Sequence, residues 1–205
     1  MALNRSAIII KITVLCILAA AMNFFLSYIF MNLLRFPLFL DTVFTAAVTF
    51  SFGLIPGLSV AVFSWLIPCI YYNVFSLFVL CGITEVLLVS ALKPGAPVIS
   101  DFAPKDKLIA AYTGIAAKLF LLYLVCALSI SVLGGVINYV SDLFLGKNLY
   151  YSPEDTFKLG LIMNNLPALA VDILARIPVN IVDRFIVIFG GYFISRGLVR
   201  LIRFT

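Results

Sequence analysis

Long apolar runs, interrupted at a few points by glycine, proline and clustered charges, make up most of the chain. They do not show the alternating ten-residue pattern of outer-membrane strands. They predict membrane helices, because a helix needs roughly 20 apolar residues to cross the hydrocarbon core. We expect helices at about 7–33, 37–52, 55–67, 74–92, 107–136 and 178–202. A shorter apolar segment at about 159–171 predicts a re-entrant or interfacial helix, or the start of a kinked sixth span.

The stretch 36–66 predicts two apolar helices joined by a sharp turn, because a proline lies between two glycines at 53–57. Asp41 lies near the start of the first helix, where a carboxylate is costly unless it is paired, hydrated or functional. Three residues that follow at helical spacing make one face of this helix polar: Thr42, Thr45 and Thr49. We therefore expect a helical hairpin with an acid near its open end.

The composition restricts the class of protein. Of 205 residues, 64% are hydrophobic and 11% are charged, and the mean hydropathy is +1.19. A soluble domain carries about a quarter charged residues. The sequence therefore predicts an all-α integral membrane protein, with residues 1–205 forming a single bundle of about six transmembrane helices.

The side chains present exclude several kinds of chemistry. There is no histidine, and the four cysteines lie in separate apolar runs without the spacing of a metal or redox site. We expect no catalytic residue, metal site or cofactor, and an intramembrane enzyme is the least favoured hypothesis. No P-loop is present, so active transport would need an ion gradient or ATP used by other subunits. No basic patch interleaved with aromatic residues indicates nucleic acid binding.

The positive charges predict the orientation in the membrane. Six spans place both termini on one side, where these basic residues gather: Arg5, Lys11, Lys93, Lys105, Lys107, Arg196, Arg200 and Arg203. The positive-inside rule then places both termini in the cytoplasm of a multi-pass protein of the cell membrane.

Two charges fall inside predicted spans at similar depths. Counted from the same membrane side, Glu85 lies roughly 12 Å and Lys118 roughly 16 Å along its helix. An unpaired charge at this depth costs several kcal/mol, so we expect a structural ion pair between them. The same pair would serve as a charge relay in a stand-alone ion-coupled transporter, but no inverted repeat supports that alternative.

One face of the first helix is small and mildly polar, a pattern that allows close helix approach in lipid. The residues of this seam include Ser6, Thr13, Cys16 and Ala20. Two interpretations remain open: packing within the bundle, or docking of a partner helix.

Polar groups also gather near the outer ends of the second and last helices, below an aromatic-rich loop at 138–158. Asp41 lies on one helix and Asp183 and Arg184 on the other. Convergent polar groups between apolar walls are typical of a small-molecule pocket. Alternatively, Asp41 and Arg184 only pair to hold the two helices together.

Two segments resemble the substrate-binding S components of energy-coupling-factor (ECF) transporters. FPLFLDTVFTA and FSFGLIPGLSVAVFS, within 36–64, resemble the second and third helices of that family. IPVNIVDRFIVIFGGYFISR, at 177–196, resembles the last helix, and Asp183-Arg184 match its Asp-Lys pair with arginine in place of lysine.

The resemblance implies a membrane-embedded binder that captures a vitamin or similar micronutrient from outside the cell. A transmembrane scaffold subunit and two cytoplasmic ATPases would be its partners. Asp41, Asn180, Asp183 and Arg184 would then be pocket or gate residues. The alternative function with the same fold is a sensing or assembly module that binds a ligand and reports to a neighbouring protein.

Overall fold

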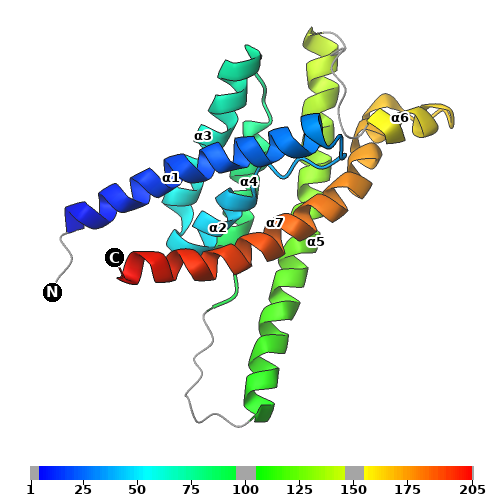
Figure 1. Cartoon of the computed structure of the whole chain (residues 1–205). Coiled ribbons are helices and arrows are strands. Elements are labelled where there is room, and N and C mark those ends of the chain that lie inside the picture. Colours follow the sequence, from blue (N-terminus) through cyan, green and yellow to red (C-terminus); the bar gives the residue numbers. More distant parts are fainter. Residues whose placement is uncertain (1–4, 96–104, 146–154, 205) are drawn as a thin grey trace.

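The structure is a computed structural model that describes residues 5–95, 105–145 and 155–204. These residues are almost entirely helical and contain no strand, which confirms the all-α prediction (Figure 1). The elements are α1 (Arg5–Tyr28), the π-helical turn η1 (Ile29–Leu33), α2 (Val43–Phe52), α3 (Leu54–Tyr72), α4 (Val79–Leu92), α5 (Lys105–Leu145), α6 (Asp155–Ile162) and α7 (Ala168–Phe204).

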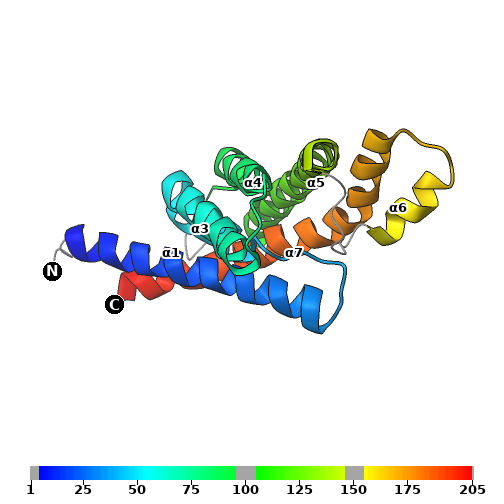
Figure 2. The ribbon, with the colours of Figure 1, turned by 90° about the horizontal axis from the view of Figure 1, so that it is seen from above.

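The helices form two groups that cross each other. Helices α3, α4 and α5 stand in a row, and α1 and α7 run obliquely across them (Figures 1 and 2). The most extensive packing is between α5 and α7, between α2 and α7, and between α1 and α3. The first turn of α1 and the last turn of α7 lie on the same side of the molecule.

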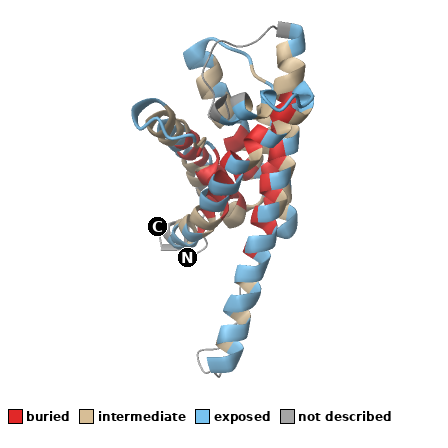
Figure 3. Cartoon of the chain, turned by 90° about the vertical axis from the view of Figure 1, so that its right-hand side faces the viewer, coloured by how far each residue is buried: buried red, intermediate tan, exposed pale blue. Residues whose placement is uncertain are grey.

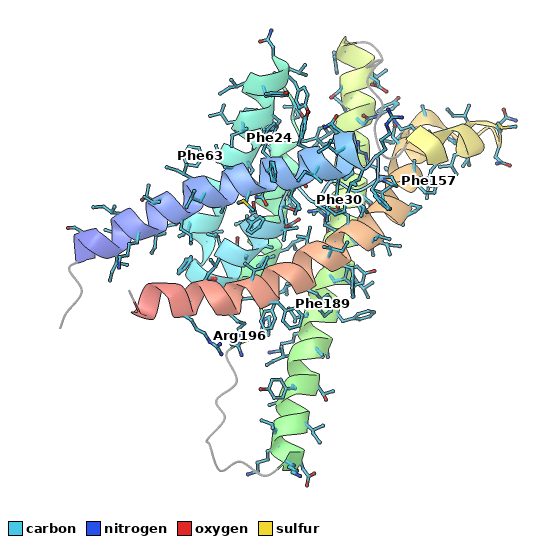
Figure 4. The ribbon with its side chains drawn as sticks, viewed as in Figure 1. Phe24, Phe30, Phe63, Phe157, Phe189 and Arg196 are labelled. Carbon is cyan, nitrogen blue, oxygen red and sulfur yellow. The ribbon has the colours of Figure 1, made fainter. Side chains whose placement is uncertain are left out.

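The core lies where α2, α5 and α7 meet, and Figure 3 shows buried residues concentrated there. Leu122 of α5 and Ile188 of α7 are both fully buried in it. Glycine allows the closest approach between α5 and α7: a Cβ on Gly135 would lie 2.7 Å from the Cα of Ile173. Phe189 packs against this core where α7 crosses α5 (Figure 4).

The predicted hairpin at 36–66 is present, and its turn is a single residue. Gly53 joins α2 to α3 with φ of 89°, a conformation that a glycine adopts without steric cost. Gly57 lets the two helices touch, because a Cβ there would lie 2.2 Å from the Thr49 hydroxyl.

Several predicted boundaries are wrong. Helix α2 begins at Val43 rather than near residue 37, and α3 continues through Pro68 to Tyr72. Helix α5 continues to Leu145, so the loop expected from residue 138 begins later. Helix α7 begins at Ala168 and continues through Pro178, so most of the short segment expected at 159–171 belongs to α6 and to the turn before α7. Residues 146–154, in the aromatic-rich loop, lie outside the described ranges.

Three helical stretches are long and apolar enough to span a membrane: Ile8–Leu33, Leu54–Tyr72 and Lys105–Phe144. Helices α2 and α4 are apolar but have only 10 and 14 residues, fewer than the roughly 20 that a straight span requires. Large apolar side chains such as Ile10, Ile17 and Phe25 are more than half exposed on α1, as on a lipid-facing surface. The described part of the chain is therefore helical and contains three candidate membrane spans.

Candidate functional site

A buried cluster of charges surrounds Arg184 of α7, whose side chain is only 4% exposed. Its Nη1 donates to the Thr42 hydroxyl at 2.7 Å and to the Glu85 carboxylate. Its Nη2 lies 3.3 Å from Oδ1 of Asp41 and 2.5 Å from Oδ2 of Asp183. We call these five residues the Arg184 cluster. They join α4 and α7 to the segment that leads into α2.

Glu85 is fully buried on α4, and its Oε2 accepts hydrogen bonds from Arg184 and from Thr42, the latter at 3.1 Å. The predicted ion pair between Glu85 and Lys118 is therefore wrong. Lys118 is exposed on α5 and lies outside the stripe by which that helix packs into the core. The charge relay that depended on this pair is not formed either.

Asp183 fixes the chain before α2. Its Oδ1 accepts a hydrogen bond of 2.8 Å from the backbone N–H of Leu40. Leu40 is buried and has φ of 46°, a left-handed conformation that is uncommon for a residue other than glycine. The left-handed backbone of Leu40 explains why no helix runs from residue 37 into α2, because a helical residue needs a negative φ.

Asp41 is the member of the cluster that reaches the surface. Its side chain is 53% exposed, whereas the side chains of Glu85 and Asp183 are fully buried. The alternative that Asp41 and Arg184 pair is compatible with this geometry, since one carboxylate oxygen meets the guanidinium. The exposed remainder of the carboxylate gives the cluster one accessible edge.

The cluster has more acid than base. Three carboxylates lie against the single guanidinium of Arg184. Glu85 Oε1 and Arg184 Nε are buried without a hydrogen-bond partner, and such groups cost about 1–3 kcal/mol each. The cluster therefore has unused hydrogen-bonding capacity of both kinds.

The polar face of α7 continues away from the cluster. Asp172, Arg176 and Asn180 recur every four residues before Arg184 and are all buried. Asn180 donates to the Ser131 hydroxyl of α5 at 2.9 Å. Of the four predicted binding residues, the structure brings Asp41, Asp183 and Arg184 together and directs the Asn180 amide to α5.

The neighbouring residues of this face are also engaged. The Arg176 guanidinium lies 4.8 Å from the ring centroid of Phe78. Asp172 forms an ion pair of 2.9 Å with Lys158 and accepts a hydrogen bond of 2.9 Å from Asn138. These contacts tie α7 to α4, α5 and α6.

A second buried polar centre was not predicted. Asn23 of α1 donates to the hydroxyls of Thr45 at 2.9 Å and Ser64 at 3.0 Å, and it accepts from the backbone N–H of Phe44 at 2.9 Å. One side chain thus joins α1, α2 and α3. An asparagine in the middle of an apolar run was the signal in the sequence.

The seam on α1 faces the protein's own interior over part of its length. Cys16 and Ala20 are buried, and the Cys16 thiol lies 3.8 Å from the carbonyl oxygen of Pro56. For these two residues the partner-docking interpretation is therefore wrong and the packing interpretation is right, since α3 already covers them. Ser6 and Thr13 are exposed, and the Thr13 hydroxyl donates to the backbone of Ile9.

Among the described residues no group of three or more His, Cys, Asp or Glu side chains is arranged to hold a metal ion. No protein-family model, curated protein or solved structure matches this chain.

Proposed function

We propose that this chain is the membrane-embedded substrate-binding subunit of an ECF-type importer. It would capture a vitamin or similar micronutrient from outside the cell and deliver it with a transmembrane scaffold and two ATPases on other chains. The observation that carries the proposal is the Arg184 cluster, in which buried charges converge and Asp41 alone extends to the surface. Ionisable groups in such a setting mark substrate or ion sites in membrane proteins.

The origin of the cluster residues supports this proposal. Asp41 and Thr42 belong to the segment that resembles the second helix of the S components, and Asp183 and Arg184 belong to the one that resembles the last helix. The two segments are far apart in the chain, and Arg184 contacts both Asp41 and Thr42. A binding site between these two helices is what the resemblance implies.

The cluster assigns a different role to each residue. Asp41 would contact the substrate, because its carboxylate is partly exposed. Arg184 and Asp183 would hold Asp41 in place, Arg184 directly and Asp183 through the backbone of Leu40. The buried Glu85 carboxylate would neutralise the charge of the Arg184 guanidinium. Asn180 would act indirectly by fixing α7 to α5.

The proposed topology has six spans with both termini in the cytoplasm. Helices α2 and α4 would be short spans, and α7, with 37 residues, would be the sixth. The distribution of lysine and arginine supports this orientation. The burial of charged side chains supports α7 as a span. Arg176, Asp183 and Arg184 of this helix are buried inside the protein rather than directed outward.

Affinity purification of the tagged full-length protein from its own host, in a mild detergent, tests the proposal. We expect a polytopic scaffold protein and two P-loop ATPases among the proteins identified by mass spectrometry. A tagged, unrelated membrane protein produced at the same level is the control. Recovery of a sensor kinase instead, or of no partner under conditions that preserve other membrane complexes, would contradict the import function.

A further inference from the structure

The N-terminal part of α5 extends beyond the rest of the protein. Residues 105–118 form a helix with few intramolecular contacts, and most of them are exposed (Figures 1 and 3). Figure 4 shows side chains of this part directed into open space on several sides. Its residues are mainly apolar or small, apart from the charged residues near either end: Lys105, Asp106, Lys107 and Lys118.

A groove lies along this exposed part of α5, with a volume of about 330 Å³. Its lining includes Pro94 and Gly95, which follow α4, and Ala110, Ala111, Gly114 and Lys118 from α5. Ala110 and Gly114 are four residues apart, which is the spacing of small residues at close helix contacts in membranes.

Two glycine positions of α5 differ in a way that points to a missing neighbour. A Cβ on Gly135 would meet backbone atoms of Ile173, so that glycine permits the contact with α7. A Cβ on Gly114 would meet no atom within 4 Å. A helical glycine costs about 1 kcal/mol relative to alanine. Nothing within the described chain uses the close approach that Gly114 permits.

Lys118 lines the same groove and forms no ion pair with a carboxylate of the described residues. Helix α5 has 41 residues and is thus about 60 Å long, roughly twice the thickness of the hydrocarbon core. If residues 105–118 lie within the membrane, Lys118 requires a counter-charge. If they lie outside it, apolar side chains such as Ile109, which is 63% exposed, face water. In either placement, a second helix surface that carries an acid would cover the apolar side chains and pair with Lys118.

A second copy of this chain does not satisfy Lys118. Two identical membrane proteins share one orientation, so a symmetric dimer has its two-fold axis along the membrane normal. The two α5 helices then run in the same direction, and a contact across their grooves sets Lys118 opposite Lys118. Filling the groove also removes Lys118 from solvent, which is unfavourable unless an acidic group pairs with it.

We propose that this groove docks a helix of a different protein, and that the helix carries an Asp or Glu opposite Lys118. The small residues at 110, 111 and 114 admit the partner's backbone, and the lysine sets its register. The groove contains no residue of the Arg184 cluster, so this docking surface does not depend on the proposed substrate site. It also differs from the α1 seam, which α3 covers.

Site-specific photocrosslinking in membranes of the native host tests this proposal. Benzoylphenylalanine replaces Ala111 in the full-length protein, with replacement of Ile109, which does not line the groove, as the matched control. We expect the probe at 111 to crosslink to a helix of another protein that has a carboxylate within one turn of the linked residue. Lys118→Glu should reduce the crosslinked product about tenfold, because like charges then face each other across the interface.

The controls separate docking from misfolding. Lys107→Glu, at the end of α5, should leave the crosslink unchanged. If Lys118→Glu is not monodisperse in detergent, Lys118→Gln replaces it and should give a smaller but measurable loss. Replacing the partner's acidic residue with lysine should restore crosslinking of the Lys118→Glu variant. Crosslinks only to lipid, to residues 96–104, to a second copy of this chain or to a helix without an acid would overturn the proposal. A yield of crosslinked product that is the same for every variant at residue 118 would also overturn it.

Discussion

Asp183 of α7 accepts a hydrogen bond of 2.8 Å from the backbone N–H of Leu40, a residue 143 positions earlier in the chain. This bond holds the segment before α2 against α7 and thereby determines where Asp41 lies. Asp183 is fully buried and also lies 2.5 Å from the Arg184 guanidinium. The substrate site that we propose therefore depends on a contact between two distant parts of the chain.

Asp183→Ala is expected to loosen this segment. The substitution leaves the Leu40 N–H without its acceptor and removes one carboxylate from Arg184, so we expect a loss of about 1–3 kcal/mol of stability. Thermal unfolding in detergent measures the loss, and hydrogen exchange at 36–42 localises it. Asp106→Ala, on the exposed first turn of α5, is the matched control and should change neither. Equal exchange at 36–42 in the two variants would contradict this role of Asp183.

Arg184 and Glu85 should be energetically coupled. Arg184→Gln leaves buried carboxylates without their cation, a change that costs about 3–5 kcal/mol for a buried pair. Adding Glu85→Gln should recover part of that loss. The free energies of unfolding of the single and double variants give the coupling energy. The effects of Glu85→Gln and Lys118→Gln on the free energy of unfolding should instead be additive. A coupling energy between these two residues would support the ion pair expected from the sequence.

Asn23 is expected to be important for the assembly of α1, α2 and α3. Asn23→Ala removes the partner of two hydroxyls and of the Phe44 N–H. We expect a loss of about 2–3 kcal/mol, since unpaired buried polar groups remain. Thr13→Ala, which removes a hydroxyl that bonds only to its own helix, should stay within about 0.5 kcal/mol of the wild type. Similar melting temperatures for both variants would show that Asn23 is not a structural centre.

Two glycines of α5 should respond oppositely to the same substitution. Gly135→Ala places a Cβ 2.6–2.8 Å from atoms of Ile173 and should destabilise the purified protein. Gly114→Ala meets no atom within 4 Å and should stabilise the isolated chain by up to about 1 kcal/mol through helix propensity. Unfolding temperatures of the two variants decide this. Destabilisation by Gly114→Ala in the purified chain would mean that its surface is not open.

The sequence was sufficient to predict the helical class and the turn between α2 and α3. The helical class follows from apolar runs of helical length, and the turn follows from the glycines and proline within 53–57. Both signals are local in the sequence. Helix ends were less predictable. The left-handed backbone of Leu40 separates α2 from the residues before it. Leu40 is also bound to Asp183, and no local pattern reveals a contact across 143 positions.

The candidate site was predictable in part. The sequence placed Asp41, Asp183 and Arg184 near one another, and the structure groups them. The sequence predicted an ion pair between Glu85 and Lys118 because the depth of each residue along its helix can be counted. Which side of each helix faces the rest of the protein cannot be counted in this way. Lys118 lies at the exposed edge of the packed face of α5, while Leu119 and Leu122 are buried. Cys16 and Ala20 show the same limit, since a small-residue face packs against its own chain as well as against a partner.

The most direct test of the central claim is whether the purified protein retains a small molecule through Asp41. The full-length protein and its Asp41→Asn variant would be purified in mild detergent from the native host, denatured, and analysed for released small molecules by mass spectrometry. Asp106→Asn, which alters an exposed acid far from the cluster along the chain, is the matched control. We predict one compound released in near-equimolar amount from the wild type and the control, and lost from Asp41→Asn while its unfolding temperature is retained. A folded wild type that releases no compound, or release that is equal with Asn at position 41, would contradict a substrate site at the Arg184 cluster.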